Sequence, residues 1–291
     1  MKNSKAPRKA ESPAKQSSQQ TITELDWFSD AILALKYHRL LLLVGHQGRG
    51  KTSFARWAAN SLGCPDPLIL QGNPAIEQHH FWGYERLVNG NMVWEDGFLA
   101  NALKTKRWLI IEDFNAVPVD VRAVLNDLRD GRESCTNPLN KERILVPPTR
   151  SDDYGFRIIA TANPESMKCN SNRSLGQALL DGFICLPEIP EIDLATIRSM
   201  LASRFPNASP GTISVAIEEW EKYRQIRGKD ESSQDSHSEN GSFLTFRSLE
   251  QLVGLLESGM RLSTAVEYSV IAKFRPFPDL YSAAKIKFSL E

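Results

Sequence analysis

Long apolar runs are missing from this chain of 291 residues. The most apolar run, Leu40 to Val44, is far shorter than the roughly 18 residues that a membrane-spanning helix needs. The N-terminus has no apolar stretch of the kind found in secretory signals. We therefore expect a cytoplasmic protein without a membrane anchor.

Cysteine is scarce, and neither sign of charge is in excess. The cysteines form no CxxC pair and no Cys/His cluster, which predicts reduced thiols and argues against a disulfide framework or a structural zinc site; they are Cys64, Cys135, Cys169 and Cys185. Basic and acidic residues balance at 35 each. Bulk charge therefore selects neither nucleic acid nor an anionic membrane as the partner.

Two segments are too polar to fold alone. Residues 1–20 hold five basic residues, one acid and no aromatic residue, a composition that cannot offset the entropy of ordering. We predict a flexible basic tail over residues 1–22, either without a role or as a weak anchor for nucleic acid or an acidic protein. A second polar stretch, residues 228–242, predicts a long loop.

Short apolar runs alternate with helical patterns between residues 23 and 190. The apolar runs are 40–44, 67–70, 108–111, 157–160 and 183–186, and the helical patterns are 52–62, 118–129 and 175–181. Continuous apolar runs of this length are typical of strands buried on both faces, and the alternation predicts an open parallel α/β sheet. Beyond residue 190 the strand pattern stops. Helical patterns there predict a small helical domain over residues 191–291, with helices at 193–204, 214–226, 247–257 and 262–272.

A GxxxxGK[ST] motif directly follows the first predicted strand and opens the first predicted helix. It comprises Gly45, His46, Gln47, Gly48, Arg49, Gly50, Lys51 and Thr52, with Ser53 next. The glycines let the backbone fold around phosphate oxygens, and amides at a helix N-terminus attract anions. We predict that these residues bind a nucleoside triphosphate, with Lys51 neutralising the β and γ phosphates and Thr52 ligating Mg²⁺.

Polar side chains end two further predicted strands. A magnesium-dependent phosphohydrolase needs one acid to hold the metal and another to orient the attacking water. Glu112 and Asp113 follow the run 108–111, and they are the candidates for these two roles. Asn163 ends another apolar run; its amide is a candidate partner of the γ-phosphate or the water, with an ordinary turn before a proline as the alternative.

The order of these blocks resembles that of the AAA+ ATPases, within them the MoxR-like and dynein-related branch that includes CbbQ, NorQ and midasin. Residues 45–52 match the Walker A loop, 108–118 resemble Walker B, Asn163 matches sensor one, and Arg247 matches the sensor-two arginine. The resemblance implies a P-loop α/β core with a helical lid, and ATP and Mg²⁺ bound at the subunit interfaces of a ring. It also implies catalytic roles for Asn163 and Arg247, and a protein partner that the ring remodels or activates, often one with a von Willebrand factor A domain.

The branch is indicated by residues 81–97, between the second and third predicted strands. Asn89 and Gly90 lie between short apolar runs, which predicts a hairpin because both tolerate positive φ. The segment is similar to the helix-two insert of MoxR-like proteins, and a helical pattern follows from Phe98. Phe81-Trp82-Gly83 also resembles the pore loop of threading motors, with a core aromatic pair as the alternative reading.

Two positions depart from the family pattern. Asn115 and Pro118 fix the Walker B register, so that Glu112-Asp113 reverses the usual Asp-Glu order. The resemblance therefore implies that Glu112 holds the metal and that Asp113 is catalytic. Aspartate is one methylene shorter than glutamate, and a misplacement near 1 Å can cost about a hundredfold in rate. Gly182 stands where the family has an arginine finger, a residue that elsewhere contributes roughly 10³ to 10⁵ in rate. Candidate replacements are Arg129, Arg132 and Arg173.

These features favour a MoxR-like AAA+ ATPase with slow hydrolysis. The alternative is a hydrolysis-deficient, ATP-binding switch or structural ring subunit. A nucleic-acid-associated motor is a further alternative, which neutral charge disfavours and the basic tail keeps open.

Overall fold

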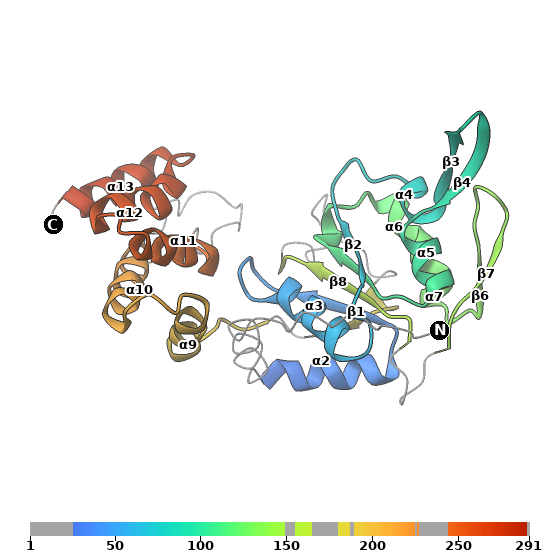
Figure 1. Ribbon diagram of the computed structural model, residues 1–291, viewed down its shortest axis with the longest axis horizontal. Coiled ribbons are helices and arrows are strands. Elements are labelled where there is room, and N and C mark those ends of the chain that lie inside the picture. Colours follow the sequence, from blue (N-terminus) through green and yellow to red (C-terminus); the bar gives the residue numbers. More distant parts are fainter. Residues whose placement is uncertain are drawn as a thin grey trace, which may run out of the picture. The chain divides into compact units, whose positions relative to one another are not determined.

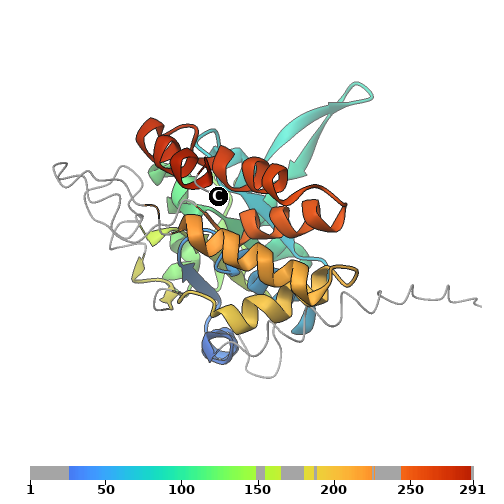
Figure 2. The ribbon, with the colours of Figure 1, turned by 90° about the vertical axis from the view of Figure 1, so that its left-hand side faces the viewer.

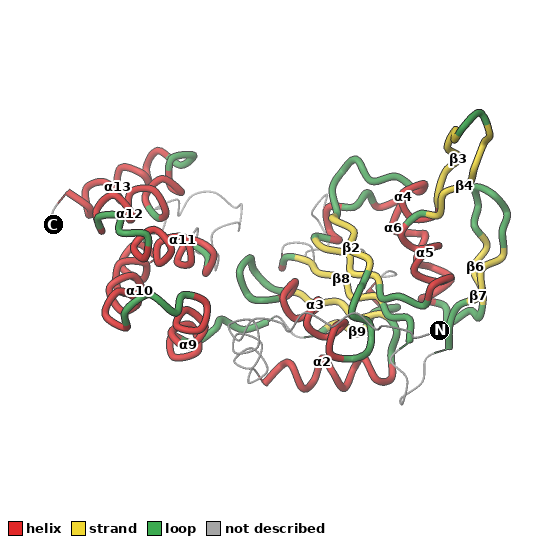
Figure 3. The backbone as a smooth tube through the Cα atoms, viewed as in Figure 1, coloured by secondary structure: helices red, strands yellow, loops and turns green. Residues whose placement is uncertain are grey.

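The computed structural model describes residues 26–148, 155–164, 180–186, 189–224, 226 and 244–289. The chain divides into two compact units, which we call the core unit (Leu25–Pro190) and the helical unit (Glu191–Glu291). Figure 3 distinguishes the helices and strands of both. Several predicted features lie outside the described residues: the tail at 1–22, the helix at 175–181 except its last two residues, the loop at 228–242, Cys169 and Arg173.

A five-stranded sheet forms the centre of the core unit. Its strands are β1 (Leu40–Val44), β2 (Leu68–Gln71), β5 (Leu109–Glu112), β8 (Ile158–Ala162) and β9 (Ile184–Cys185). They pair in the order β2-β5-β8-β1-β9, and every pair is parallel. The prediction of an open parallel α/β sheet is confirmed, and each predicted run lies within two residues of its strand. All five residues of β1 are buried, as expected of a central strand covered on both faces.

Helices cover both faces of this sheet (Figure 1). On one face lie α2 (Asp26–Tyr37), which packs against β1, and α3 (Lys51–Ser61), which packs against β5 and β8. On the other lies α5 (Phe98–Thr105), against β2 and β5. The helix expected at 118–129 is broken into α6 (Val119–Arg122), a 3₁₀ turn at Ala123–Leu125, and α7 (Asn126–Arg129). The backbone stays right-handed there, so the turn tightens the helix without reversing the chain.

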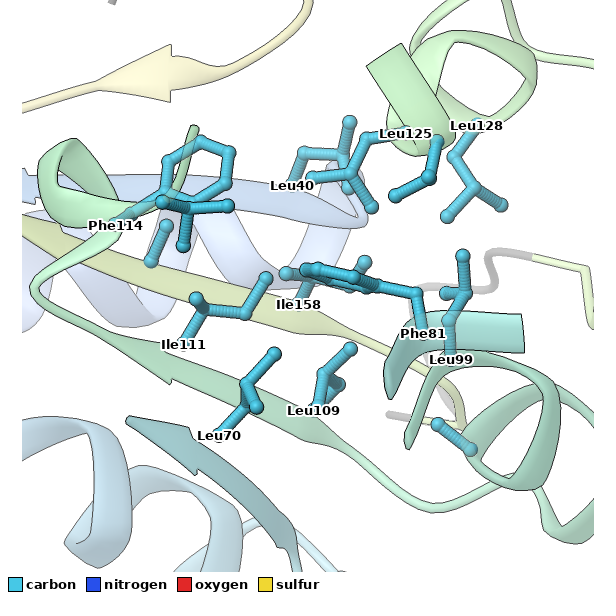
Figure 4. Packing of buried hydrophobic residues seen from close by; sticks show 14 of the residues in the cluster. Leu40, Leu70, Phe81, Leu99, Leu109, Ile111, Phe114, Leu125, Leu128 and Ile158 are labelled. Atoms are coloured by element: carbon cyan, nitrogen blue, oxygen red, sulfur yellow. The ribbon is translucent and has the colours of Figure 1, made fainter. Parts of the chain in front are cut away.

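The aromatic pair Phe81 and Trp82 ends the short helix α4 (Gln78–Trp82). The side chains are 0% and 3% exposed and belong to the main core cluster. Figure 4 shows the Phe81 ring among residues of the sheet, beside Ile158. The packing interpretation is therefore confirmed. The pore-loop interpretation of Phe81-Trp82-Gly83 is wrong, because buried rings leave no surface to grip a passing peptide.

The predicted hairpin is present as β3 (Gly83–Val88) and β4 (Asn91–Asp96). Its two-residue turn has φ of 50° at Asn89 and 83° at Gly90, the positive values that match the twist of the flanking strands. Figures 1 and 2 show the hairpin projecting from the rest of the core unit. A second hairpin, β6 (Ser134–Thr136) with β7 (Arg143–Leu145), was not predicted.

The helical unit contains α9 (Leu194–Arg204), α10 (Pro210–Arg224), α11 (Phe246–Glu257), α12 (Leu262–Ser269) and α13 (Pro278–Ser289). The first four were predicted, although a 3₁₀ helix at Ile271–Phe274 replaces the end of the fourth; α13 was not predicted. Asp193 caps α9 by accepting hydrogen bonds from the amides of Ala195 and Thr196, both at 2.9 Å. Across the described parts of both units, every helix is too short or too polar to cross a membrane.

Candidate functional site

The phosphate-loop segment connects the end of β1 to the start of α3, as predicted. Gly45 N–H donates to Ala162 O (3.2 Å), and Phe54 N–H donates to Gly50 O (2.8 Å), which starts the helix. Gly48 and Gly50 have φ of 80° and 85°, values that L-residues with a side chain rarely adopt. These glycines let the backbone take the tight turn that a phosphate-binding loop needs.

Lys51, the first residue of α3, lies within this loop. Only 8% of it is exposed, and its Nζ donates to the carbonyls of Gly45 (2.5 Å) and His46 (2.8 Å). A buried ammonium beside a helix N-terminus is a favourable arrangement for binding phosphate groups. The loop therefore fits a polyphosphate.

Glu112 ends β5 and is positioned opposite Gln71 of β2. Its Oε1 lies 2.9 Å from Nη2 of Arg56, and the two side chains are 15% and 51% exposed. Arg56 was not singled out from the sequence. The sequence did hold a signal for Arg56. It follows Thr52 by four residues on the same predicted helix, and residues so spaced share a helix face.

Asp113 follows β5 in the left-handed region, with φ 49° and ψ 47°. That conformation costs a residue with a side chain about 1–2 kcal/mol, and such residues cluster at functional sites. Two contacts hold it: its N–H donates to Thr161 Oγ1 (3.1 Å), and its Oδ2 accepts from Gln71 Nε2 (2.8 Å). Sequence reasoning missed both partners, which lie on the two strands flanking β5.

Gly72 approaches the same turn closely. Its N–H donates to Glu112 O at 2.7 Å. A Cβ on Gly72 would lie 2.4 Å from Asp113 O, a separation that side-chain carbons do not tolerate. The absence of a side chain at residue 72 therefore lets the two acids take their places.

Arg122 supports the backbone that follows the two acids. It is 3% exposed, and it donates from Nε to Val117 O (2.8 Å) and from Nη2 to Asn115 O (2.9 Å). Its guanidinium carbon lies 5.9 Å from the centre of the Phe114 ring. Burial lowers the pKa of Arg122, although an arginine keeps its charge in proteins. This buried cation ties together the backbone that follows the two acids.

Asn163 directly follows β8 and is partly buried. Val44 pairs with Ala162, so Asn163 adjoins the start of the phosphate loop. Because the carboxyl ends of parallel strands share one edge, the sheet brings together the loop, both acids and Asn163. Arg247 belongs to the helical unit, where it is exposed in the first turn of α11, and its part in the site stays a prediction.

Gly182 stands at the position of the family's arginine finger, and the Arg129 side chain fills the space that a side chain at residue 182 would need. A Cβ there would lie 1.7 Å from Cγ of Arg129. Arg129 and Arg132 each form an ion pair within the chain, with Asp130 (2.8 Å) and Asp127 (2.9 Å) respectively. A role for either arginine in a neighbouring subunit's site stays a prediction.

Oxygen ligands of the kind that Mg²⁺ prefers lie at this edge of the sheet. They are the Thr52 hydroxyl, in the first turn of α3, and the Glu112 carboxylate. Together with the loop amides and Lys51 they suit a magnesium–nucleotide complex. The fold and the site define a P-loop nucleotide-binding α/β protein.

Comparison with known proteins gives the family. Residues 40–183 match the AAA domain (dynein-related subfamily). The chain belongs to the AAA+ ATPases of the dynein-related branch, and the resemblance seen in its sequence is confirmed.

Relatives match different shares of the chain. Midasin of Giardia intestinalis is 27% identical over 165 residues, 56% of this chain but only 3% of that protein. Midasin of Dictyostelium discoideum is 26% identical over 159 residues, 54% of this chain and again only 3% of that protein. An uncharacterized protein of Staphylococcus aureus (strain USA300) is 23% identical over 271 residues, covering 90% of this chain and 95% of its own length. The crystal structure of NtrX from Brucella abortus in complex with ADP covers 88% of this chain and 51% of its own, with 15% identity and a TM-score of 0.46.

Proposed function

We propose that this chain is a MoxR-like AAA+ ATPase. In the proposed function, it binds Mg-ATP at the subunit interfaces of a ring and uses binding and slow hydrolysis to remodel or activate a protein partner. The observation that carries the proposal is the buried Lys51 ammonium inside a glycine loop, at the sheet edge where Glu112 and Asp113 emerge. Structural glycine turns do not need a buried cation.

Each side chain has a distinct part. Lys51 exchanges the carbonyls of Gly45 and His46 for phosphate oxygens, a stronger, charge-assisted interaction. Thr52 and Glu112 hold Mg²⁺, which when bound neutralises charge on the phosphates. Asp113 orients the attacking water and takes up its proton, and Asn163 offers an amide to the water or the γ-phosphate.

Slow hydrolysis is supported by the contacts of Asp113. Its carboxylate is one methylene shorter than the family's glutamate, and Oδ2 is engaged by Gln71. This hydrogen bond restrains the carboxylate that would orient the water. The same bond, together with Gly182, favours the second candidate: an ATP-binding switch that turns over little or no nucleotide.

A turnover assay separates the two candidates. We expect the purified wild-type chain to release phosphate slowly in Mg-ATP, Lys51→Ala to release none, and Lys273→Ala to match wild type. Lys273 is exposed on the 3₁₀ helix of the helical unit, so its substitution controls for the loss of one lysine. Nucleotide binding without phosphate release above the Lys51→Ala background would establish the switch instead.

Ring formation and the partner belong to the same proposal. Light scattering with and without ATP should show a nucleotide-dependent increase in mass. A von Willebrand factor A domain is the partner class to test first, because the resembled families often act on such domains. A mass that stays monomeric under all nucleotide conditions would contradict the ring.

A further inference from the structure

Glu112, the acid that we assign to the metal, forms an ion pair with Arg56. Arg56 lies one helical turn beyond Thr52 on α3. The two residues therefore share a face of the helix, and Thr52 is the other proposed metal ligand. Its Nη2 is 2.9 Å from Oε1 of Glu112, within contact distance for a charge-assisted hydrogen bond. One carboxylate oxygen is therefore already bound to a cation.

A guanidinium in this position opposes a divalent cation in two ways. It neutralises the charge through which Glu112 attracts the metal, and its own charge repels the metal. Both effects are weaker in water than in a protein interior. Because half of the Arg56 side chain is exposed, solvent screening keeps both of them modest.

The glutamate at residue 112 suits an exchange of partners. Glutamate has one more rotatable side-chain bond than the aspartate usual at this position. Its carboxylate can therefore move from one cation to the other while β5 keeps its pairing with β2 and β8.

We propose that Arg56 competes with Mg²⁺ for Glu112 and so raises the Mg²⁺ concentration at which the site binds its metal–nucleotide complex. This inference rests on the proposed nucleotide site. It adds that the site responds to the level of free Mg²⁺. An arginine within the same chain sets the concentration at which it responds.

The test measures the affinity of a mant-labelled ADP by fluorescence, in EDTA and across a Mg²⁺ series. In Arg56→Gln we expect the half-maximal Mg²⁺ concentration to fall about two- to fivefold, with the affinity in EDTA unchanged. Arg56→Lys keeps the charge and should stay within twofold of wild type. Arg107→Gln is the matched control. Arg107 also pairs with a carboxylate, that of Asp66 at 2.6 Å, but it precedes β5 at the opposite end of the strand.

Other results would overturn the inference. An unchanged half-maximal Mg²⁺ concentration would show that the pair does not compete with the metal, and a higher one would show that Arg56 positions Glu112 for it. Weaker binding in EDTA would show that Arg56 contacts the phosphates. Failure of wild type to bind in both EDTA and Mg²⁺ would overturn the proposed function itself, a result distinct from a change in metal dependence alone.

Discussion

The two sides of the candidate nucleotide site are built differently. The phosphate side is one continuous segment, residues 45–52, whose shape follows from its own glycines and the helix that it starts. The acid side places Glu112 and Asp113 through contacts from separate segments: Arg56, Gln71, Gly72 and Thr161. A local motif therefore specifies phosphate binding, whereas long-range packing specifies the position of the acids. The acid side can be altered without disturbing the phosphate loop.

The largest expected effect tests whether the two sides act separately. Lys51→Ala removes the buried ammonium and should weaken nucleotide binding in EDTA about a hundredfold, since hydrogen bonds to charged groups contribute about 1.5–3 kcal/mol each. Glu112→Gln should leave that affinity within twofold, because its part requires Mg²⁺. Isothermal titration calorimetry in EDTA measures both affinities. Equal losses of affinity in the two variants would show that the phosphate side and the acid side do not act separately.

Glycine substitutions on each side come next. Gly72→Ala places a Cβ 2.4 Å from a backbone oxygen and should lower the free energy of unfolding by about 3 kcal/mol. Gly50→Ala meets no atom within 4 Å and should cost about 1 kcal/mol, the conformational penalty of its positive φ. Denaturant titration of the core unit's transition in the full-length chain measures the difference. A greater loss for Gly50→Ala would reverse our view of which side depends on packing.

Arg122→Met should lower the free energy of unfolding by about 2 kcal/mol, because it leaves the carbonyls of Asn115 and Val117 without their buried donor. It should also slow phosphate release while leaving nucleotide affinity in EDTA unchanged. Thermal unfolding and the turnover assay check the two parts. Unchanged turnover by a folded variant would limit Arg122 to a role in stability.

The smallest expected effect concerns Gln71. Gln71→Ala frees the carboxylate of Asp113 and should raise the rate of phosphate release about two- to fivefold, with nucleotide affinity unchanged. Gln71→Asn is the matched control, because it keeps a side-chain amide and shortens the side chain by only one methylene. A slower Gln71→Ala enzyme would mean that the hydrogen bond positions Asp113 for catalysis.

Much of the fold could be read from the chain because its signals are local. The runs that became β1, β2, β5, β8 and β9 are apolar at nearly every residue, as is typical of strands buried on both faces. Asn89-Gly90 specified the first hairpin through backbone preference alone. The strands of the second hairpin, β6 and β7, have only three residues each. They are too short to show the alternation of apolar and polar residues that marks a strand in sequence.

The acid side could be predicted only in part. Glu112 and Asp113 were found because they follow an apolar run in sequence. Their partners Gln71 and Thr161 come from strands 42 and 48 residues away from Asp113 in sequence, and become neighbours only through the order of the sheet. Phe81 and Trp82 show the same limit, because an aromatic pair looks alike in sequence whether it faces solvent or a core.

The crowding at Gly182 constrains how this chain could evolve. With Cγ of Arg129 where the first side-chain atom of residue 182 would go, a single codon change to arginine would create a clash before it created a catalyst. Recovery of the family's finger would have to begin with a smaller residue at 129, or with a shift of that side chain. A descendant that regained fast turnover through residue 182 would be expected to carry an arginine there together with one of these two changes.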